Sequence, residues 1–143
     1  MRTVEQLLHV KGGDIWSIAP METAYRALQI MAEKNVGALL VMENEKVAGI
    51  FSEREYARKV ILKDKSSKNT SVSELMTRAV VYIDADATLE EGMALMTAKH
   101  IRHLPVLQKN RLIGLVTLGD VVRQLISDQQ FAIRELEKYI TGG

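Results

Sequence analysis

The sequence predicts an α+β protein made of two copies of one β-α-β-β-α unit, and two observations predict it. The first is an internal repeat, because residues 49–58 (GIFSEREYAR) are answered by residues 114–123 (GLVTLGDVVR) at an offset of 65 positions. Pairs outside these stretches, such as Met31 with Met96, keep the same offset. The second is that each copy alternates short apolar runs with segments whose apolar residues recur at helical spacing. Such a duplication normally means two copies of one supersecondary unit.

Each copy is expected to contain a short strand, a helix, a hairpin of two apolar strands and a closing helix. The first helix shows the pattern plainly, because Ala24, Ala27, Leu28 and Met31 fall on one face at helical spacing. Thr88 is placed to cap the corresponding helix of the second copy. The expected elements are strand 14–18, helix 22–34, strands 37–42 and 46–51 and helix 53–62 in the first copy, and strand 79–83, helix 89–99, strands 104–107 and 111–116 and helix 118–126 in the second.

A polar run between the copies, residues 63–70, is expected to link them. We therefore assign the first repeat to residues 3–65 and the second to residues 71–127, with a C-terminal helix and tail at 128–143. The tail helix should pack on the body or on another subunit, and Gly142-Gly143 should end it. A three-stranded unit cannot bury both faces of its sheet. We expect the two repeats to pack sheet against sheet with pseudo-twofold symmetry, which would leave two equivalent clefts.

Composition argues against several classes of protein. A net charge of +1 gives no broad case for nucleic acid or an anionic membrane as a partner. The absence of cysteine removes disulfides, thiol catalysis and thiolate metal sites. The N-terminus turns polar at once, and no apolar run approaches the roughly 20 residues of a membrane span. No catalytic constellation, metal-ligand spacing or phosphate-binding glycine motif is present. We therefore expect a cytoplasmic protein that is not an enzyme and has no metal or catalytic cofactor.

Each copy ends an apolar strand with a hydroxyl residue and places a carboxylate three residues later, as Ser52 with Glu55 and Thr117 with Asp120. This spacing fits a helix capping box, which is the interpretation that spacing alone favours. The same arrangement can also hold a nucleotide. A free helix N-terminus attracts phosphate, and a short carboxylate can accept hydrogen bonds from a ribose diol. Capping and ligand binding do not exclude each other.

The repeated pattern Gly-apolar-x-Ser/Thr-x-x-Asp-x-x-Arg resembles the CBS domain, named for cystathionine β-synthase. Residues 36–39 (VGAL) and 101–106 (IRHLPV) resemble the middle strands of that family. The resemblance covers roughly residues 3–126, and residues 52–59 (SEREYARK) further resemble small stand-alone bacterial CBS-pair proteins. Two such domains form a Bateman module, which implies an adenosine-containing ligand. The first copy departs from the family, because Glu55 stands where the family has Asp.

The resemblance implies a ligand site in each cleft, with residues drawn from both repeats. In the better cleft a hydroxyl and a carboxylate would take phosphate and ribose, backbone groups would face the adenine edge, small residues would wall the base, and Arg102 or His103 would face the phosphate. These residues are Ala19, Pro20, Ala24, Val36, Gly37, Ala38, Arg102, His103, Thr117 and Asp120. The second cleft is the poorer ribose site, because the extra methylene of Glu55 moves its carboxylate outward. Its residues are Ser52, Arg54, Glu55, Asp84, Ala85 and Ile101.

The resemblance implies a regulatory or sensor module without catalysis. AMP is the first ligand expected, with ATP, NAD, NADH and S-adenosylmethionine as other candidates, and binding would shift the population of conformations or oligomers. Two alternatives stay open, an NAD(H)-binding redox sensor and a ligand-free protein-interaction module. Besides the nucleotide, the expected partners are a second copy of the chain, in a homodimeric disc of four CBS repeats, and an unidentified regulated protein. Neither a membrane nor a nucleic acid is an expected partner.

Overall fold

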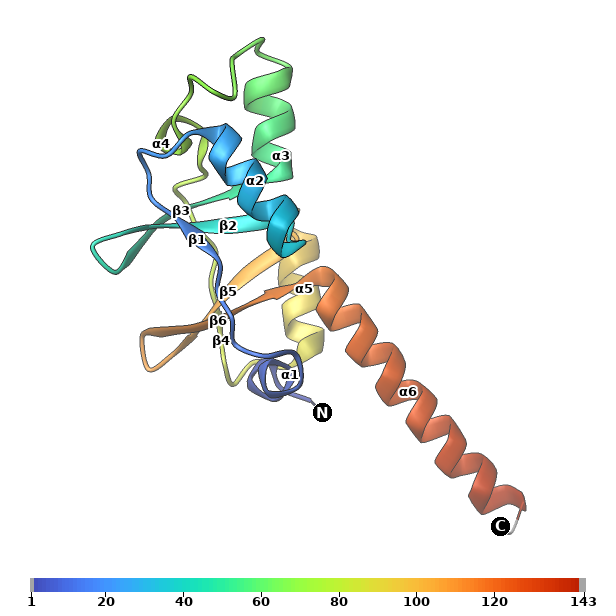
Figure 1. Cartoon of the computed structure of the whole chain (residues 1–143). Coiled ribbons are helices and arrows are strands. Elements are labelled where there is room, and N and C mark those ends of the chain that lie inside the picture. Colours follow the sequence, from blue (N-terminus) through green and yellow to red (C-terminus); the bar gives the residue numbers. More distant parts are fainter. Residues whose placement is uncertain (1, 142–143) are drawn as a thin grey trace. The chain divides into compact units, whose positions relative to one another are not determined.

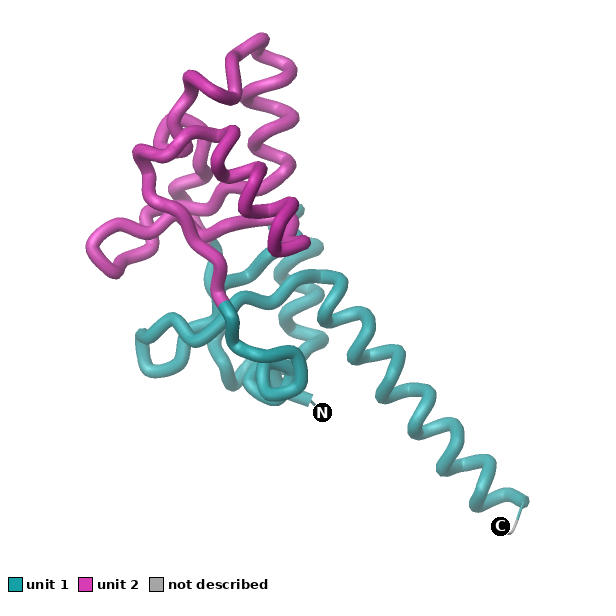
Figure 2. Tube along the Cα trace, viewed as in Figure 1, with its two compact units in different colours: residues 1–14, 81–143 teal, residues 15–80 magenta. Residues whose placement is uncertain are grey.

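The structure is a computed structural model that describes residues 2–141, and its chain divides into two compact units (Figures 1 and 2). Unit 1 combines the N-terminal segment Met1–Asp14 with Val81–Gly143, and unit 2 is Ile15–Val80. Each unit therefore contains one β-α-β-β-α copy and the short helix that precedes the other copy in the sequence. Gly142 and Gly143, which were expected to end the tail, lie outside the described residues.

Unit 2 contains a three-stranded sheet in the order β1-β2-β3, in which β1 is parallel to β2 and β2 is antiparallel to β3. The hairpin turns at Asn44 and Glu45, which both have positive φ, so its backbone twist matches that of the strands. Its core joins apolar residues of the sheet, such as Phe51, with Met31 from a helix. The elements of unit 2 are β1 (Ser17–Ile18), α2 (Ala24–Lys34), β2 (Ala38–Glu43), β3 (Lys46–Ser52), α3 (Glu53–Tyr56), the π-helical turn η1 (Ala57–Ile61) and α4 (Val72–Leu75).

Unit 1 repeats this architecture with the sheet order β4-β5-β6. Lys109 and Asn110 take the positive φ values of the hairpin turn, and a register shift follows Val106 as one follows Val41 in unit 2. The sequence repeat therefore extends to the irregularity of the sheet. The elements of unit 1 are α1 (Val4–Lys11), β4 (Ile83–Asp84), α5 (Leu89–Lys99), β5 (His103–Gln108), β6 (Arg111–Thr117) and α6 (Leu118–Thr141).

The short helices α1 and α4 are held by equivalent contacts in the two units. α1 begins after Thr3, which bridges to Thr88, and α4 begins after Ser71, which bridges to Thr23. Both helices bury apolar side chains in the core of the unit that contains them. Because each helix packs with the other copy of the repeat, unit 1 joins two segments that are far apart in sequence, whereas unit 2 is the continuous segment Ile15–Val80.

The two closing helices differ from the expectation and from each other. The helix expected at 53–62 is a single α-helical turn followed by the π-helical turn η1. The helix expected at 118–126 does not stop there, because α6 runs without a break for 24 residues, through the segment expected to be a separate tail helix. No Gly or Pro lies between Asp120 and Thr141 to end it. The opening strands are shorter than expected, two residues each, because each pairs with only two residues of its middle strand.

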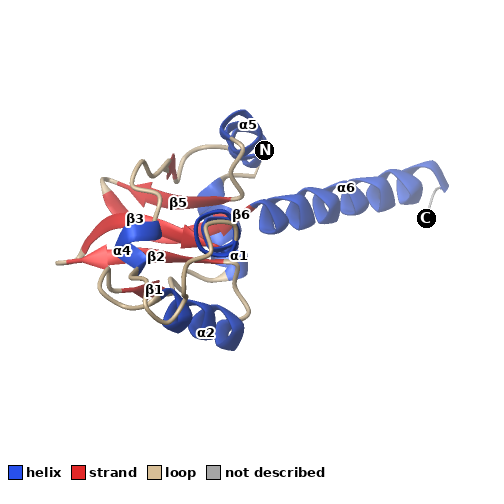
Figure 3. Cartoon of the chain, turned by 90° about the horizontal axis from the view of Figure 1, so that it is seen from above, coloured by secondary structure: helices blue, strands red, loops and turns tan. Residues whose placement is uncertain are grey.

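The first half of α6 packs on unit 1 and the second half does not. Val121 is fully buried, and Leu118 and Leu125 pack against the same core. Every residue from Gln129 to Thr141 is exposed, and Figure 3 shows this part of the helix extending away from the rest of unit 1. Within residues 2–141, no helix has both the length and the apolar character needed to cross a bilayer.

Candidate functional site

The site in unit 1 is built where β6 ends and α6 begins. The backbone N–H of Thr117 donates to Oδ2 of Asp120 at 2.9 Å, and the N–H of Asp120 donates to Oγ1 of Thr117 at 3.1 Å. This reciprocal pair is the predicted capping box, and it fixes the rotamer of the carboxylate at the positive end of a long helix. The Asp120 side chain is only 13% exposed.

Two cations meet at this carboxylate. The ammonium group of Lys11, at the end of α1, bonds to Oδ2 of Asp120 and also donates to the carbonyl oxygen of Leu115 at 2.8 Å. The guanidinium of Arg123 donates to Oδ1 at 2.9 Å from the next turn of α6. The site in unit 1 therefore holds one carboxylate, two cations and a helix N-terminus close together.

The pKa of Asp120 lies below its ordinary value. Burial by itself would raise this pKa, but the hydrogen bonds from Lys11 and from the N–H and hydroxyl of Thr117, together with the charge of Lys11, lower it further than burial raises it. Asp120 is therefore ionised at neutral pH, and it can accept hydrogen bonds.

Arg102 and His103 lie beside this capping box. His103 is the strand partner of Thr117, and the carbonyl oxygen of Arg102 accepts a 2.9 Å hydrogen bond from the N–H of Leu118. Within unit 1 the structure thus places near one another four residues expected at the better site, which are Arg102, His103, Thr117 and Asp120.

The corresponding carboxylate in unit 2 is used internally. Oε2 of Glu55 accepts from the N–H of Ser52 at 2.9 Å and from the hydroxyl of Ser52, and Oε1 accepts from the hydroxyl of Thr77 at 2.7 Å. Burial would raise the pKa of Glu55, but these hydrogen bonds outweigh it and hold the pKa below its ordinary value. Glu55 is buried, so it caps α3 and ties that helix to the segment after α4.

The other residues expected in the better cleft belong to unit 2. Val36 and Gly37 precede β2, and the carbonyl oxygen of Gly37 accepts from the N–H of Glu53 at 3.1 Å. Because Ile18 pairs with Val41, Ala19 follows β1 toward the other end of β2, about 13 Å from Ala38 along the strand. The remaining members are Pro20, which is buried, and Ala24, which lies in the core of unit 2.

The second set is also dispersed within its units. Ser52 and Arg54 lie at the start of α3 with Glu55, and the N–H of Arg54 donates to Oγ of Ser52 at 3.2 Å. In unit 1, Asp84 pairs with Leu107 at the end of β5, whereas Ile101 lies before the start of that strand. The remaining member, Ala85, is fully buried in the core.

Two residues of these networks, Lys11 and Thr77, were not predicted from the sequence. Lys11 lies 109 positions from Asp120 in the sequence. Thr77 follows α4 and lies 22 positions from Glu55. The repeat gives no signal for either contact, because Lys11 ends α1 and Thr77 follows α4, and each of these helices packs with the other copy of the repeat.

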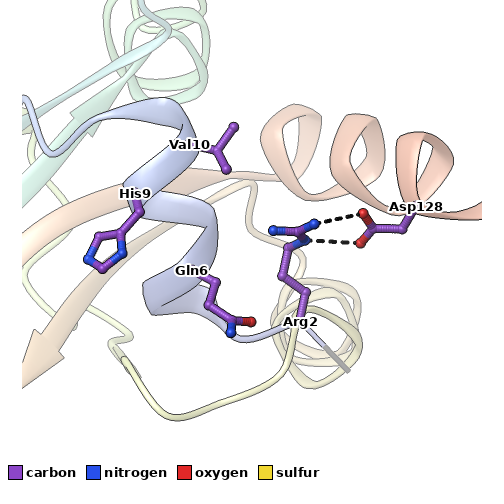
Figure 4. Close-up of a pocket in the computed structure, with 5 residues that line it drawn as sticks. All are labelled: Arg2, Gln6, His9, Val10 and Asp128. Carbon is purple, nitrogen blue, oxygen red and sulfur yellow. Dashed lines mark hydrogen bonds and ion pairs between the residues drawn. The ribbon is translucent and has the colours of Figure 1, made fainter. Parts of the chain in front are cut away.

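A separate open depression of about 470 Å³ lies in unit 1 (Figure 4). Arg2 and Asp128 line this depression and form an ion pair with two hydrogen bonds. The rest of the lining comes from Gln6, His9 and Val10 of α1. None of these residues belongs to the predicted site. Among residues 2–141, no group of three or more His, Asp or Glu side chains could hold a metal ion.

Comparison with known proteins shows the same architecture in solved structures. A CBS-domain protein of Burkholderia ambifaria assigned to signal transduction is 46% identical, with a TM-score of 0.86 over 89% of this chain and 96% of its own. The CBS-domain protein ATU1752 of Agrobacterium tumefaciens is 33% identical, with a TM-score of 0.82 over 85% of this chain and 98% of its own.

A curated relative extends the likeness to plants. The mitochondrial CBS domain-containing protein CBSX3 of Arabidopsis thaliana is 39% identical over 127 residues, which are 85% of this chain and 62% of that protein. The family model of the CBS domain matches twice, at residues 10–61 and 72–127. The chain therefore belongs to the CBS-domain family and carries two CBS repeats.

Proposed function

We propose that this protein is a non-catalytic regulatory module that binds an adenine nucleotide, with AMP as the first ligand, and signals by a change of conformation or association. CBS-domain proteins are regulatory, ligand-binding modules, and this chain belongs to them. The observation that carries the choice of ligand is the Asp120 carboxylate, which is held ionised beside Lys11 and Arg123 at the start of α6. A fixed carboxylate suits a ribose diol, and cations at a helix N-terminus suit a phosphate.

Lys11 gives this proposal a mechanism for signalling. A carboxylate has about four acceptor positions, and the N–H of Thr117, Lys11 and Arg123 use three of those on Asp120. A diol needs two positions, so nucleotide binding would release one cation from Asp120 toward the phosphate. Release of Lys11 would carry the effect of nucleotide binding to the C-terminal end of α1, because Lys11 is the last residue of that helix.

Asp120 is the better candidate than Glu55 because of what surrounds each carboxylate. Both oxygens of Glu55 already accept hydrogen bonds inside unit 2, and a diol would have to displace Ser52 or Thr77 from a buried position. We therefore propose one nucleotide per chain.

Isothermal titration calorimetry of the full chain with AMP, ATP, NADH and S-adenosylmethionine tests the proposal. AMP is expected to bind at one equivalent. Asp120→Asn should weaken this binding about 10- to 100-fold, because hydrogen bonds to a charged acceptor contribute about 1.5–3 kcal/mol. Glu90→Gln is the matched control, since Glu90 is an exposed acid in the first turn of α5 in the same unit.

Each alternative function predicts a different result. A redox sensor would bind NADH far more tightly than AMP. A ligand-free interaction module would give neither heat nor a shift in melting temperature with any of the four compounds. Equal affinity of wild type and Asp120→Asn for AMP would remove Asp120 from the site.

A further inference from the structure

The outer part of α6 carries an apolar face that the described chain does not cover. Val122 is 37% exposed, Ile126 is 50% exposed and Ile140 is 79% exposed. The helix is anchored to unit 1 by the buried Val121 and by Asp128, whose carboxylate accepts two hydrogen bonds from Arg2. The apolar face therefore belongs to a helix whose direction is fixed by other residues.

This face has the spacing of a coiled-coil seam. Its residues alternate at intervals of four and three, so they occupy positions a and d of successive heptads, and a single polar residue interrupts them. These positions are Val122 (d), Ile126 (a), Gln129 (d), Ile133 (a), Leu136 (d) and Ile140 (a).

The opposite face of the helix is polar, so the apolar residues form a narrow seam. Arg134, Glu135 and Lys138 lie on that face, and Phe131 is an apolar exception to it. A narrow seam of this kind fits one other helix, whereas a membrane-binding helix has a broad apolar face with cations along the other side.

We propose that this seam pairs with the α6 helix of a second copy of the chain, in antiparallel orientation. In an antiparallel pair, an a residue of one helix faces a d residue of the other. One register satisfies all six positions at once, because Ile126 faces Leu136, Ile133 faces Gln129 and Ile140 faces Val122 of the second copy. The contact is self-complementary, as a twofold interface requires.

Charge selects this orientation. Position e faces position e in an antiparallel pair, so Arg123 of each copy lies against Glu137 of the other. In a parallel pair e faces g, and the g residues Leu125, Ala132 and Tyr139 offer no charged partner to Arg123 or to Glu137. The antiparallel pair also places Tyr139, 86% exposed, against Leu125 of the second copy.

The pairing does not require a bound nucleotide, so its test is the mass of the ligand-free protein. By light scattering at micromolar concentration, wild type should have twice the 16.0 kDa mass of one chain. Leu136→Asp should raise the dissociation constant about tenfold or more, because it buries an unpaired charge at a d position. Phe131→Asp is the matched control, since Phe131 is 61% exposed and Leu136 is 60% exposed, and it should remain a dimer.

A monomeric wild type overturns the proposal, and so does a Leu136→Asp variant that stays dimeric. Loss of the dimer in both variants overturns it too, because the seam would then not be the contact. Glu137→Arg should weaken the dimer, and adding Arg123→Glu in the same chain should restore it.

Cysteine pairing tests the orientation, because the chain has no cysteine of its own. Ile126→Cys and Leu136→Cys proteins should form a disulfide-linked dimer when they are mixed under oxidising conditions, and neither should do so alone. Rapid linking of each variant with itself would mean parallel pairing and would overturn the antiparallel register.

Discussion

Asp120 and Glu55 occupy the same position in the two repeats, yet their carboxylates meet different partners. The extra methylene of Glu55 lets its carboxylate reach the hydroxyl of Thr77 as well as Ser52, so it is satisfied inside unit 2. The shorter side chain of Asp120 keeps its carboxylate at the helix start, where Lys11 and Arg123 reach it. One methylene thus separates a structural cap from a candidate ligand group.

Glu55→Gln is expected to destabilise the protein by about 1–3 kcal/mol at neutral pH, because its amide group cannot accept from both Ser52 and Thr77. The folded pKa of Glu55 lies below its ordinary value of 4.5, so this contribution is present above pH 4.5 and is lost as pH falls through the folded pKa. Urea denaturation at a series of pH values should therefore show the two proteins converging at acid pH.

Glu53→Gln is the control for that series, since Glu53 is an exposed acid next to the same cap. It should follow the wild-type curve at every pH. A constant difference between wild type and Glu55→Gln across the acid range would contradict the assigned role of the carboxylate.

At the scale of elements, the repeated glycines explain how the exchanged helices dock. A Cβ on Gly114 would lie 2.7 Å from Cδ2 of Leu8 in α1, and a Cβ on Gly49 would lie 2.8 Å from Sδ of Met76 after α4. The sequence shows these glycines as part of a repeated motif. The structure shows that each leaves room for the short helix that precedes the other repeat in the same chain.

Gly114→Ala should cost about 1–3 kcal/mol, because Leu8 is itself packed in the core and has little room to move. Leu8→Ala removes the obstructing atoms, so the double variant should be less destabilised than the sum of the two single variants. Thermal denaturation of the four proteins in this cycle measures the coupling.

Gly92→Ala supplies the contrast within the same unit. Its Cβ would lie 3.4 Å from Ile83, an ordinary contact, and alanine favours helix by about 0.8–1.0 kcal/mol over glycine. This variant should match or exceed wild type. Strict additivity in the Gly114 and Leu8 cycle would rule out the steric explanation.

Much of the element pattern could be predicted from residues close in sequence. Helix 89–99 and the hairpin strands are confirmed within a residue or two, and Thr88 caps α5 as predicted. The continuity of α6 and the π-helical turn η1 could not be predicted, because apolar spacing alone does not fix where a helix ends or changes its hydrogen bonding.

At the scale of the whole molecule, the two repeats of the sequence do not coincide with the two compact units of the structure. Residues 2–13 lie beside the second repeat in unit 1, and their α1 side chains Val4, Leu7 and Leu8 belong to its core. Residues 131–141 also belong to unit 1, yet they bury none of their side chains. The two ends of the chain therefore contribute unequally to folding.

Deletion of residues 1–13 should strongly lower the melting temperature, because it opens a cavity at three core positions. Deletion of residues 131–143, which removes the same length of chain, should leave the melting temperature of the dilute monomer unchanged. Differential scanning calorimetry at low protein concentration compares the two. Equal destabilisation by both deletions would show that the outer part of α6 supports its own unit.

The sequence by itself determined the duplication, the order of the elements, the capping boxes and the family, because each depends on residue spacing along one copy. Only the tertiary structure decided that α1 and α4 are exchanged between copies, that Lys11 meets Asp120 and that Thr77 meets Glu55. These contacts join distant parts of the chain, and they form because each helix buries its apolar face where a glycine leaves room for it. That choice depends on the shape of a folded surface, which spacing along the sequence does not contain.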